Sequence, residues 1–212
     1  MIPGMDLIEF ISWASLLGVA LVVFAESGLL IGFFLPGDSL LLTTGLLVNR
    51  GVIDYSIHVV VLVLFIAAVL GDNTGYWFGK KVGRSLFKRQ DSVIFHKANL
   101  MKAEKFYEKH GNKTIVLARF VPFARTFAPI LAGISHMHYK TFVTYNIVGA
   151  LLWAAGLTYL GYYAGAWLES QGIDIDKYLL LIIAGVVAIS LLPAIYHVIK
   201  DRQMHKKSSS SQ

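Results

Sequence analysis

The chain has 212 residues, of which 56% are hydrophobic and 15% are charged, and its mean hydropathy is +0.61. These values lie outside the usual range of soluble domains and indicate an integral membrane protein. The absence of cysteine excludes disulfides, thiolate metal sites and cysteine nucleophiles. The net charge of +6 is confined to two basic segments, which favours the positive-inside bias of membrane proteins over nucleic-acid binding.

Four segments are candidates to cross a bilayer, which takes about 20 apolar residues: residues 10–24, 56–78, 141–167 and 178–199. The start of the chain lacks the pattern of a cleaved signal peptide, so we expect none. We predict one integral membrane domain over residues 1–199 and a disordered basic tail at 200–212. The predicted fold class is an all-α, multi-pass membrane protein.

The stretch 24–39 is almost entirely apolar, yet it carries Glu26 and Asp38 and is interrupted by Pro36 and Gly37. An acid inside an apolar segment is costly and is therefore a functional candidate. Pro-Gly stops a helix because proline lacks an N–H and glycine tolerates a turn. We predict two helical arms around this break, with Asp38 either in a functional site or simply capping the second arm.

A second interrupted apolar stretch spans residues 114–133 and carries Arg119, Arg125, Pro122 and Pro129. Both prolines are predicted to break the helix. Arg119 either faces the interior or snorkels to the cytoplasmic headgroups. Snorkelling is less suited to Arg125, which lies between the two prolines.

Residues 80–113 hold ten Lys or Arg against three acids, and we predict that they are cytoplasmic, together with the basic tail. Within them, residues 97–110 are predicted to form either an amphipathic helix on the membrane surface or a solvated loop helix. The acidic loop at 169–176 is expected outside. These three predicted locations are consistent with each other only if residues 114–133 enter and leave the membrane at the cytoplasmic face, as a re-entrant hairpin.

A shift of 86 residues places Pro36 on Pro122 and aligns two Gly-Tyr-aromatic-x-Gly patterns. We predict an inverted repeat, about residues 24–79 and 114–167, in which each half is a re-entrant hairpin plus a transmembrane helix. A hairpin arm of about 10 residues rises about 15 Å, half the hydrocarbon thickness. The two hairpin tips are therefore expected to meet near the bilayer midplane.

At this meeting point Glu26 and Asp38 are expected to face Arg119 and Arg125, so that the charges compensate each other. Burial strengthens proton binding by a carboxylate and a nearby arginine weakens it, which makes these acids candidates for proton coupling. The planar guanidinium group suits phosphate. We hypothesise that protonation of the acids frees the arginines to hold a lipid phosphate. Asp72 is either a further proton-coupling residue or the partner of a basic neighbour.

Glycines recur every four residues from Gly71 to Gly83, a spacing typical of close helix packing. The spacing does not match G-x-G-x-x-G after a strand, so it indicates no dinucleotide site, and we expect no cofactor. His136 and His138 lack a third ligand, so we expect no metal site either.

Four motifs, each weak alone, are specific in combination: F-x-E at 24–26, F-L-P-G-D at 34–38, G-D-x-x-G-Y at 71–76 and K-H-G…R-F-x-P-x-x-R…A-G over 109–133. In these motifs the chain resembles the DedA family, the bacterial branch of the VTT-domain superfamily. The resemblance covers about residues 20–165 and implies a polytopic inner-membrane protein with paired re-entrant hairpins. The essential acids of that family match Glu26 and Asp38, and its essential arginines match Arg119 and Arg125.

The resemblance also implies lipid translocation driven by the proton-motive force. The lipid is either undecaprenyl phosphate, returned across the bacterial inner membrane, or a phospholipid that is flipped or scrambled. A proton-coupled antiporter for small ions or drugs stays open as an alternative. No nucleophile-and-base pattern accompanies the histidines, so we do not expect an enzyme. The expected partners are membrane lipids and protons, and a homodimer is left open.

Overall fold

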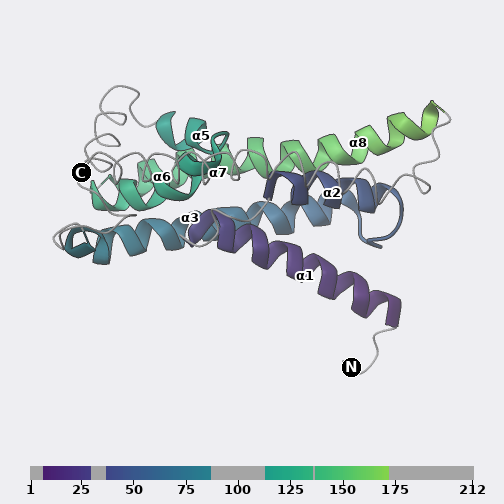
Figure 1. The fold of residues 1–212 in the computed structure, drawn as a ribbon, viewed down its shortest axis with the longest axis horizontal. Helices are drawn as coiled ribbons and strands as arrows, with labels where there is room; N and C mark the ends of the chain where they lie inside the picture. The colour runs from purple at the N-terminus through teal and green to yellow at the C-terminus, as the bar shows by residue number, and fades with distance from the viewer. Residues whose placement is uncertain (1–6, 30–36, 87–112, 136, 172–212) are drawn as a thin grey trace, which may run out of the picture.

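The computed structural model describes residues 7–29, 37–86, 113–135 and 137–171, and every regular element in these ranges is helical (Figure 1). In chain order the elements are α1 (Leu7–Gly28), α2 (Gly37–Asn49), α3 (Ile57–Leu86), α5 (Thr114–Ala118), α6 (Pro122–Ile134), α7 (Tyr139–Ala150), the π-helical segment η3 (Leu151–Ala155) and α8 (Gly156–Ser170). The predicted all-α class is confirmed for this part of the chain. The predicted surface helix at 97–110, the last apolar segment at 178–199, the tail and Pro36 lie outside the described residues.

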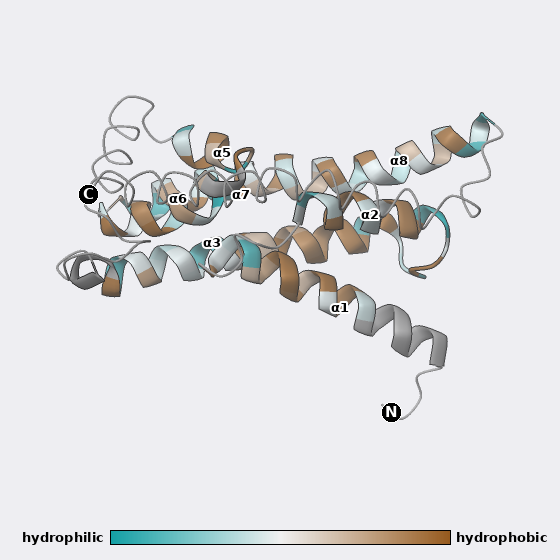
Figure 2. Ribbon diagram, in the orientation of Figure 1, coloured by the Kyte–Doolittle hydropathy of each residue, from teal (hydrophilic) through white to brown (hydrophobic). Residues whose placement is uncertain are grey.

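Two of the described helices are long and apolar enough to cross a membrane. Ile57–Val82 of α3 has 26 residues, and its most apolar stretch of 18 residues has a mean hydropathy of 2.0. Tyr139–Ser170, the continuous run of α7, η3 and α8, has 32 residues, and its most apolar stretch of 18 residues has a mean hydropathy of 1.4. At about 1.5 Å per residue both exceed the roughly 30 Å of a hydrocarbon core. Figure 2 shows that apolar residues dominate α1 and the part of α3 beside it, while polar residues gather where α1 ends against α3.

Helix α1 is continuous from Leu7 to Gly28, so Glu26 lies in its last turn and not in a separate arm that begins at residue 24. The segment contains no proline, and a single glycine such as Gly18 in a helix interior weakens a helix without ending it. Helix α2 begins at Gly37 and carries Asp38 in its first turn. The first break therefore separates a long helix, not a half-helix, from α2.

The second break lies between α5 and α6. Val121 is extended (φ −119°, ψ 111°), the conformation that a following proline favours, and α6 begins at Pro122. Helix α6 continues through Pro129, so the predicted break at Pro129 is wrong. A proline inside a helix removes one backbone hydrogen bond, but α6 is supported along α3, where the ring of Pro129 packs close to Gly75.

The helix that follows each break packs against the long helix of the other half of the chain. Helix α6 lies along α3, and α2 lies along α8 (Figure 1). Within each half, α1 packs on α3 and α5 packs on α7. The two halves are therefore interlocked and do not form two separate bundles.

Glycines bring these helix pairs into close contact. A Cβ atom on Gly79 would overlap the carbonyl oxygen of Ile130, and one on Gly133 would overlap the carbonyl oxygen of Tyr76. The close packing predicted for the glycine ladder of α3 is thus confirmed where the ladder is described. The α2–α8 pair uses the same device, through Gly45 and Gly161.

We expect Gly79→Ala to destabilise the protein, because the added methyl group pushes α6 away from α3. Overpacking of this kind typically costs about 1–3 kcal/mol. Gly18→Ala and Gly156→Ala are matched controls, since nothing lies within 4 Å of a Cβ at either position. Thermal unfolding of the detergent-solubilised protein, followed by size-exclusion chromatography, should give a lower midpoint for Gly79→Ala alone. Equal midpoints for all three variants would contradict the close α3–α6 contact.

Candidate functional site

Arg125, in the first turn of α6, lies between two carboxylates that come from different helices. Its Nη2 donates to Oε1 of Glu26 in α1, and its Nη1 donates to Oδ1 of Asp38 in α2 over 2.7 Å. Arg125 is 4% exposed and Glu26 is 1% exposed, whereas the Asp38 side chain is 45% exposed. Both acids of the first broken segment therefore bind one arginine of the second, and Asp38 forms the accessible edge of the cluster.

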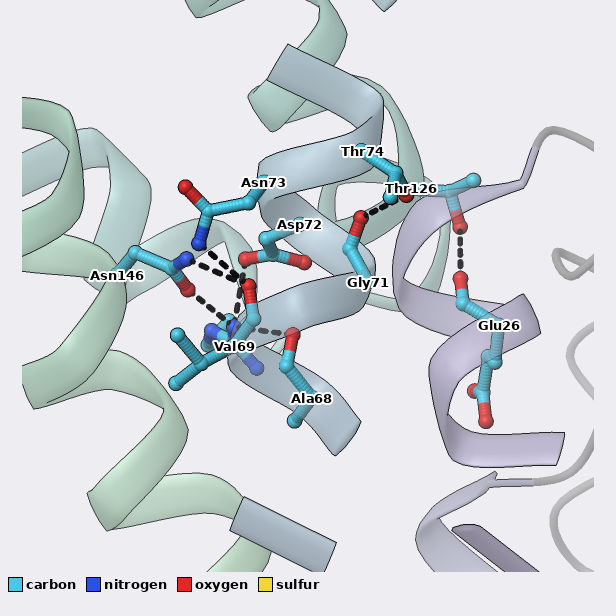
Figure 3. Close-up of polar contacts among 10 residues, drawn as sticks. Glu26, Ala68, Val69, Gly71, Asp72, Asn73, Thr74, Thr126 and Asn146 are labelled. Carbon is cyan, nitrogen blue, oxygen red and sulfur yellow. Dashed lines mark hydrogen bonds and ion pairs between the residues drawn. The ribbon is translucent and has the colours of Figure 1, made fainter. Parts of the chain in front are cut away.

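Gly37 and Thr126 help to place the Glu26 carboxylate. A Cβ atom on Gly37 would overlap this carboxylate, so a glycine at the start of α2 leaves the space that the side chain fills. Next to Arg125, the hydroxyl of Thr126 donates to the backbone carbonyl oxygen of Glu26 at 3.4 Å (Figure 3). The break between α1 and α2 thus both reverses the chain and makes room for the ion pair.

Arg119, at the end of α5, forms a second buried centre. It is 1% exposed, and its Nη2 donates to Oδ2 of Asp72 and to Oδ1 of Asn146, each at 2.5 Å. This burial excludes the alternative in which Arg119 snorkels to the headgroups. The predicted set of pairs is corrected as well, because Arg119 binds Asp72 of α3 and does not bind Glu26 or Asp38. Asp72 has the basic partner that one alternative predicted.

Asn146, on α7, orients the Asp72–Arg119 pair. Its Oδ1 accepts from Arg119, and its Nδ2 donates to the backbone carbonyl oxygen of Val69 at 3.2 Å, so the amide points toward α3 (Figure 3). Asn146 is fully buried. Sequence reasoning missed this residue, although a polar amide inside an apolar transmembrane segment was an available signal.

Trp153, in η3, is the second site residue that sequence reasoning missed. Its indole N–H donates to Oδ1 of Asp38 at 2.7 Å, and Cζ of Arg125 lies 4.4 Å from its ring centroid. The side chain is 1% exposed. Its place in the middle of a transmembrane segment, away from the interfacial zone that tryptophan prefers, was the only sequence signal.

The two centres together hold three carboxylates (Glu26, Asp38 and Asp72) and two guanidinium groups (Arg119 and Arg125), so one negative charge is in excess when all are ionised. Within the described part of the chain, several buried polar atoms of this cluster have no hydrogen-bond partner: Glu26 Oε2, Asp72 Oδ1, Arg119 Nε and Nη1, and Arg125 Nε. Buried polar atoms of native proteins usually find partners. The cluster can therefore accept a proton on a carboxylate oxygen and offer N–H donors to an anionic oxygen.

The remaining candidates lie apart from this cluster or contribute no ligands. His138 is exposed at the start of α7, and His136 lies outside the described residues. Among the described residues, no group of three His, Cys, Asp or Glu side chains could hold a metal ion. The chemistry of the site is thus that of two buried arginines and the carboxylates that hold them.

Comparison with known proteins places this chain in a family. Residues 35–163 match the VTT domain. The chain is 44% identical to Protein DedA of Escherichia coli K12 over 183 residues, which cover 86% of this chain and 81% of that protein. It is 43% identical over 182 residues to an uncharacterized membrane protein of Mycobacterium tuberculosis H37Rv, covering 86% of this chain and 78% of the relative.

A third relative, the inner membrane protein YqjA of Escherichia coli K12, is 35% identical over 144 residues, which cover 68% of this chain and 64% of that protein. No solved structure matches the chain. The family model covers the segment that begins just before the first described residue of α2 and extends into α8, and the first two relatives extend the similarity over most of the sequence. The chain therefore belongs to the DedA family of VTT-domain membrane proteins.

Proposed function

We propose that this protein is a proton-coupled transporter of lipid phosphate, which uses the proton-motive force to return undecaprenyl phosphate across the bacterial inner membrane. The observation that carries this proposal is the placement of Arg125 between Glu26 and Asp38, where the two broken segments meet. Arginine binds phosphate through two parallel N–H donors. In this structure carboxylates occupy both terminal nitrogens of the guanidinium group.

A phosphate headgroup and the two carboxylates compete for the same donors. When Glu26 and Asp38 are ionised, Arg125 is occupied by charge-assisted hydrogen bonds. A proton on either acid weakens its bond to Arg125 and frees a donor for phosphate. Loss of that proton on the other side of the membrane restores the ion pair and releases the phosphate. Arg119, which is paired with Asp72, offers a second phosphate-binding position of the same kind.

The interlocked packing of the two halves supports an inverted repeat, in which the first half includes the whole of α1 because this helix is continuous from Leu7 to Gly28. In transporters built this way, the binding site lies where the broken helices meet, which is where Arg125 binds Glu26 and Asp38. The excess of Lys and Arg in segment 80–113 and in the C-terminal tail supports a cytoplasmic location for both in this proposal. Membrane lipids and protons remain the proposed partners, and a homodimer stays a prediction.

A phospholipid such as phosphatidylethanolamine is the second candidate substrate, because a guanidinium group recognises the phosphate that both kinds of lipid share. Such a phospholipid could be flipped with the gradient or scrambled without it. A proton-coupled antiporter for small ions or drugs is the third candidate, since the acids alone could bind and release protons. No enzymatic reaction is part of the proposal.

The test uses purified protein in proteoliposomes with labelled undecaprenyl phosphate, and measures how fast the headgroup becomes accessible on the opposite face. Losing one charge-assisted hydrogen bond costs about 1.5–3 kcal/mol, or roughly 10- to 150-fold in rate. We expect Arg125→Lys to fall in this range, Arg125→Ala to abolish transport, and Asp38→Asn to remove its dependence on the proton gradient. The matched control is Glu169→Gln, because Glu169 is 62% exposed in a surface pair with Arg50.

The outcomes separate the candidate functions. Transport that continues after the gradient is collapsed favours a scramblase, and transport of labelled phosphatidylethanolamine alone favours the phospholipid substrate. Proton flux that depends on a small cation, with no lipid movement, favours the antiporter. Unchanged lipid movement in both Arg125→Ala and Asp38→Asn would reject the role of the cluster.

The Asp72–Arg119 pair gives a separate prediction about stability. Asp72→Asn leaves the Arg119 charge buried without its carboxylate, which typically costs about 3–5 kcal/mol. Asp72→Asn combined with Arg119→Gln removes both charges, so it should be more stable than the single variant. Glu169→Gln serves again as the control and should change stability by no more than about 1 kcal/mol. Thermal unfolding in detergent measures this, and a double variant no more stable than Asp72→Asn would contradict the pairing.

A further inference from the structure

The indole of Trp153 lies close to both arginine centres. Its N–H donates to Oδ1 of Asp38, the same oxygen that accepts from Nη1 of Arg125. Its ring centroid lies 4.4 Å from Cζ of Arg125 and 5.8 Å from Cζ of Arg119, both within the range of cation–π attraction. One carboxylate oxygen thus holds both the indole and a guanidinium group, and any change in its charge affects both.

The backbone at Trp153 is unusual as well. Leu151–Ala155 is π-helical, although the elements on both sides of it are α-helical. A single π-helical turn inside an α-helix is rare and frequently occurs at a functional site. Gly156, which follows directly, is exposed, and nothing lies within 4 Å of a Cβ position there.

We propose that Trp153 is a positioning residue that transmits the protonation state of Asp38 to the path between Arg125 and Arg119, an inference that rests on the proposed function. The indole N–H is only a donor, and it binds an ionised carboxylate more strongly than a neutral acid. When Asp38 takes up a proton, this bond weakens and the ring leaves the space between the two arginines. A lipid phosphate then passes from Arg125 to Arg119. Ionised Asp38 draws the ring back and closes the path.

Five charged side chains, each from a different element, face the region around the indole. One of them must account for the pH dependence of the indole position. The arginines stay positive throughout the accessible pH range, so only carboxylates titrate there. Of the carboxylates, Asp38 is the one that binds the indole, and it is also the most exposed. The groups are Glu26 from α1, Asp38 from α2, Asp72 from α3, Arg119 from the end of α5 and Arg125 from α6.

The first test reads Trp153 directly by fluorescence and needs no transport. Trp13, Trp77 and Trp167 are replaced by phenylalanine, so that Trp153 is the single tryptophan. Its emission is then recorded in lipid nanodiscs from about pH 3 to about pH 9, a range that begins in the acidic region where carboxylates generally take up protons. We expect a sigmoidal change of emission with pH, and loss of that change when Asp38→Asn is added.

Asp54→Asn in the same single-tryptophan background is the matched control, because Asp54 is an exposed acid in the loop before α3. It should leave the curve unchanged. A flat curve in the parent protein, or the same sigmoidal curve in Asp38→Asn, would overturn the proposal.

The second test uses Trp153→Phe, which keeps an aromatic ring beside the arginines but removes the N–H. In proteoliposomes this variant should still move labelled undecaprenyl phosphate, but its rate should depend less on pH than that of the parent protein, because only the competition of Glu26 and Asp38 for Arg125 remains. Trp167→Phe is the control, because Trp167 is 62% exposed on α8, and it should keep the parental pH profile. A parental pH profile in Trp153→Phe would overturn the role of the indole.

The two tests fail independently of the proposed function. If the parent protein moves no lipid phosphate but its Trp153 emission still follows Asp38, the proposed function fails and the coupling of Trp153 to Asp38 stands. If lipid phosphate moves with the gradient but Trp153→Phe keeps the parental pH profile, the proposed function stands and this inference fails.

Discussion

The ion pairs of Arg125 with Glu26 and Asp38 are the constraint on which the rest of this structure depends. A buried charge is tolerated only where an opposite charge lies beside it. The three side chains come from α6, α1 and α2, so these helices must stay in place together, or a charge is left buried without a partner. The glycine contacts between α6 and α3 and between α2 and α8 then fix these helices against the two long ones. The site and the fold are thus stabilised by the same contacts.

The transmembrane helices were predictable because length and hydropathy alone define them, and α3 and the run from Tyr139 to Ser170 coincide with their predicted segments. The breaks were harder, because the effect of a proline depends on what surrounds it. Pro122 stands at the first position of α6, where no N–H is needed, whereas Pro129 lies inside α6, which is supported by α3. The sequence did not predict that α1 continues to Gly28. The absence of proline permits a continuous helix there but does not show where the helix ends.

The charged site residues were conspicuous in the sequence because a charge in an apolar segment needs a reason. Their partners were not, since pairing depends on helix rotation and on which helices become neighbours. Arg119 meets Asp72 only because α5 packs on α7 and α7 packs on α3. Trp153 and Asn146 carry no charge, and residues of their kinds are ordinary in transmembrane helices. Only their contacts with Asp38 and Arg119 distinguish them.

The excess of carboxylates over guanidinium groups determines how the cluster responds to an added anion. Three carboxylates and two guanidinium groups leave one negative charge in excess, in a region where Glu26, Asp72 and both arginines are nearly inaccessible. Under the proposed function, a lipid phosphate would add more negative charge, which a poorly solvated site cannot hold without compensation. Protons are the compensation that three carboxylates can take up, so binding of phosphate and binding of protons favour each other by linkage. An equal number of acids and arginines would lack this excess, and phosphate would then have less need of a proton to enter.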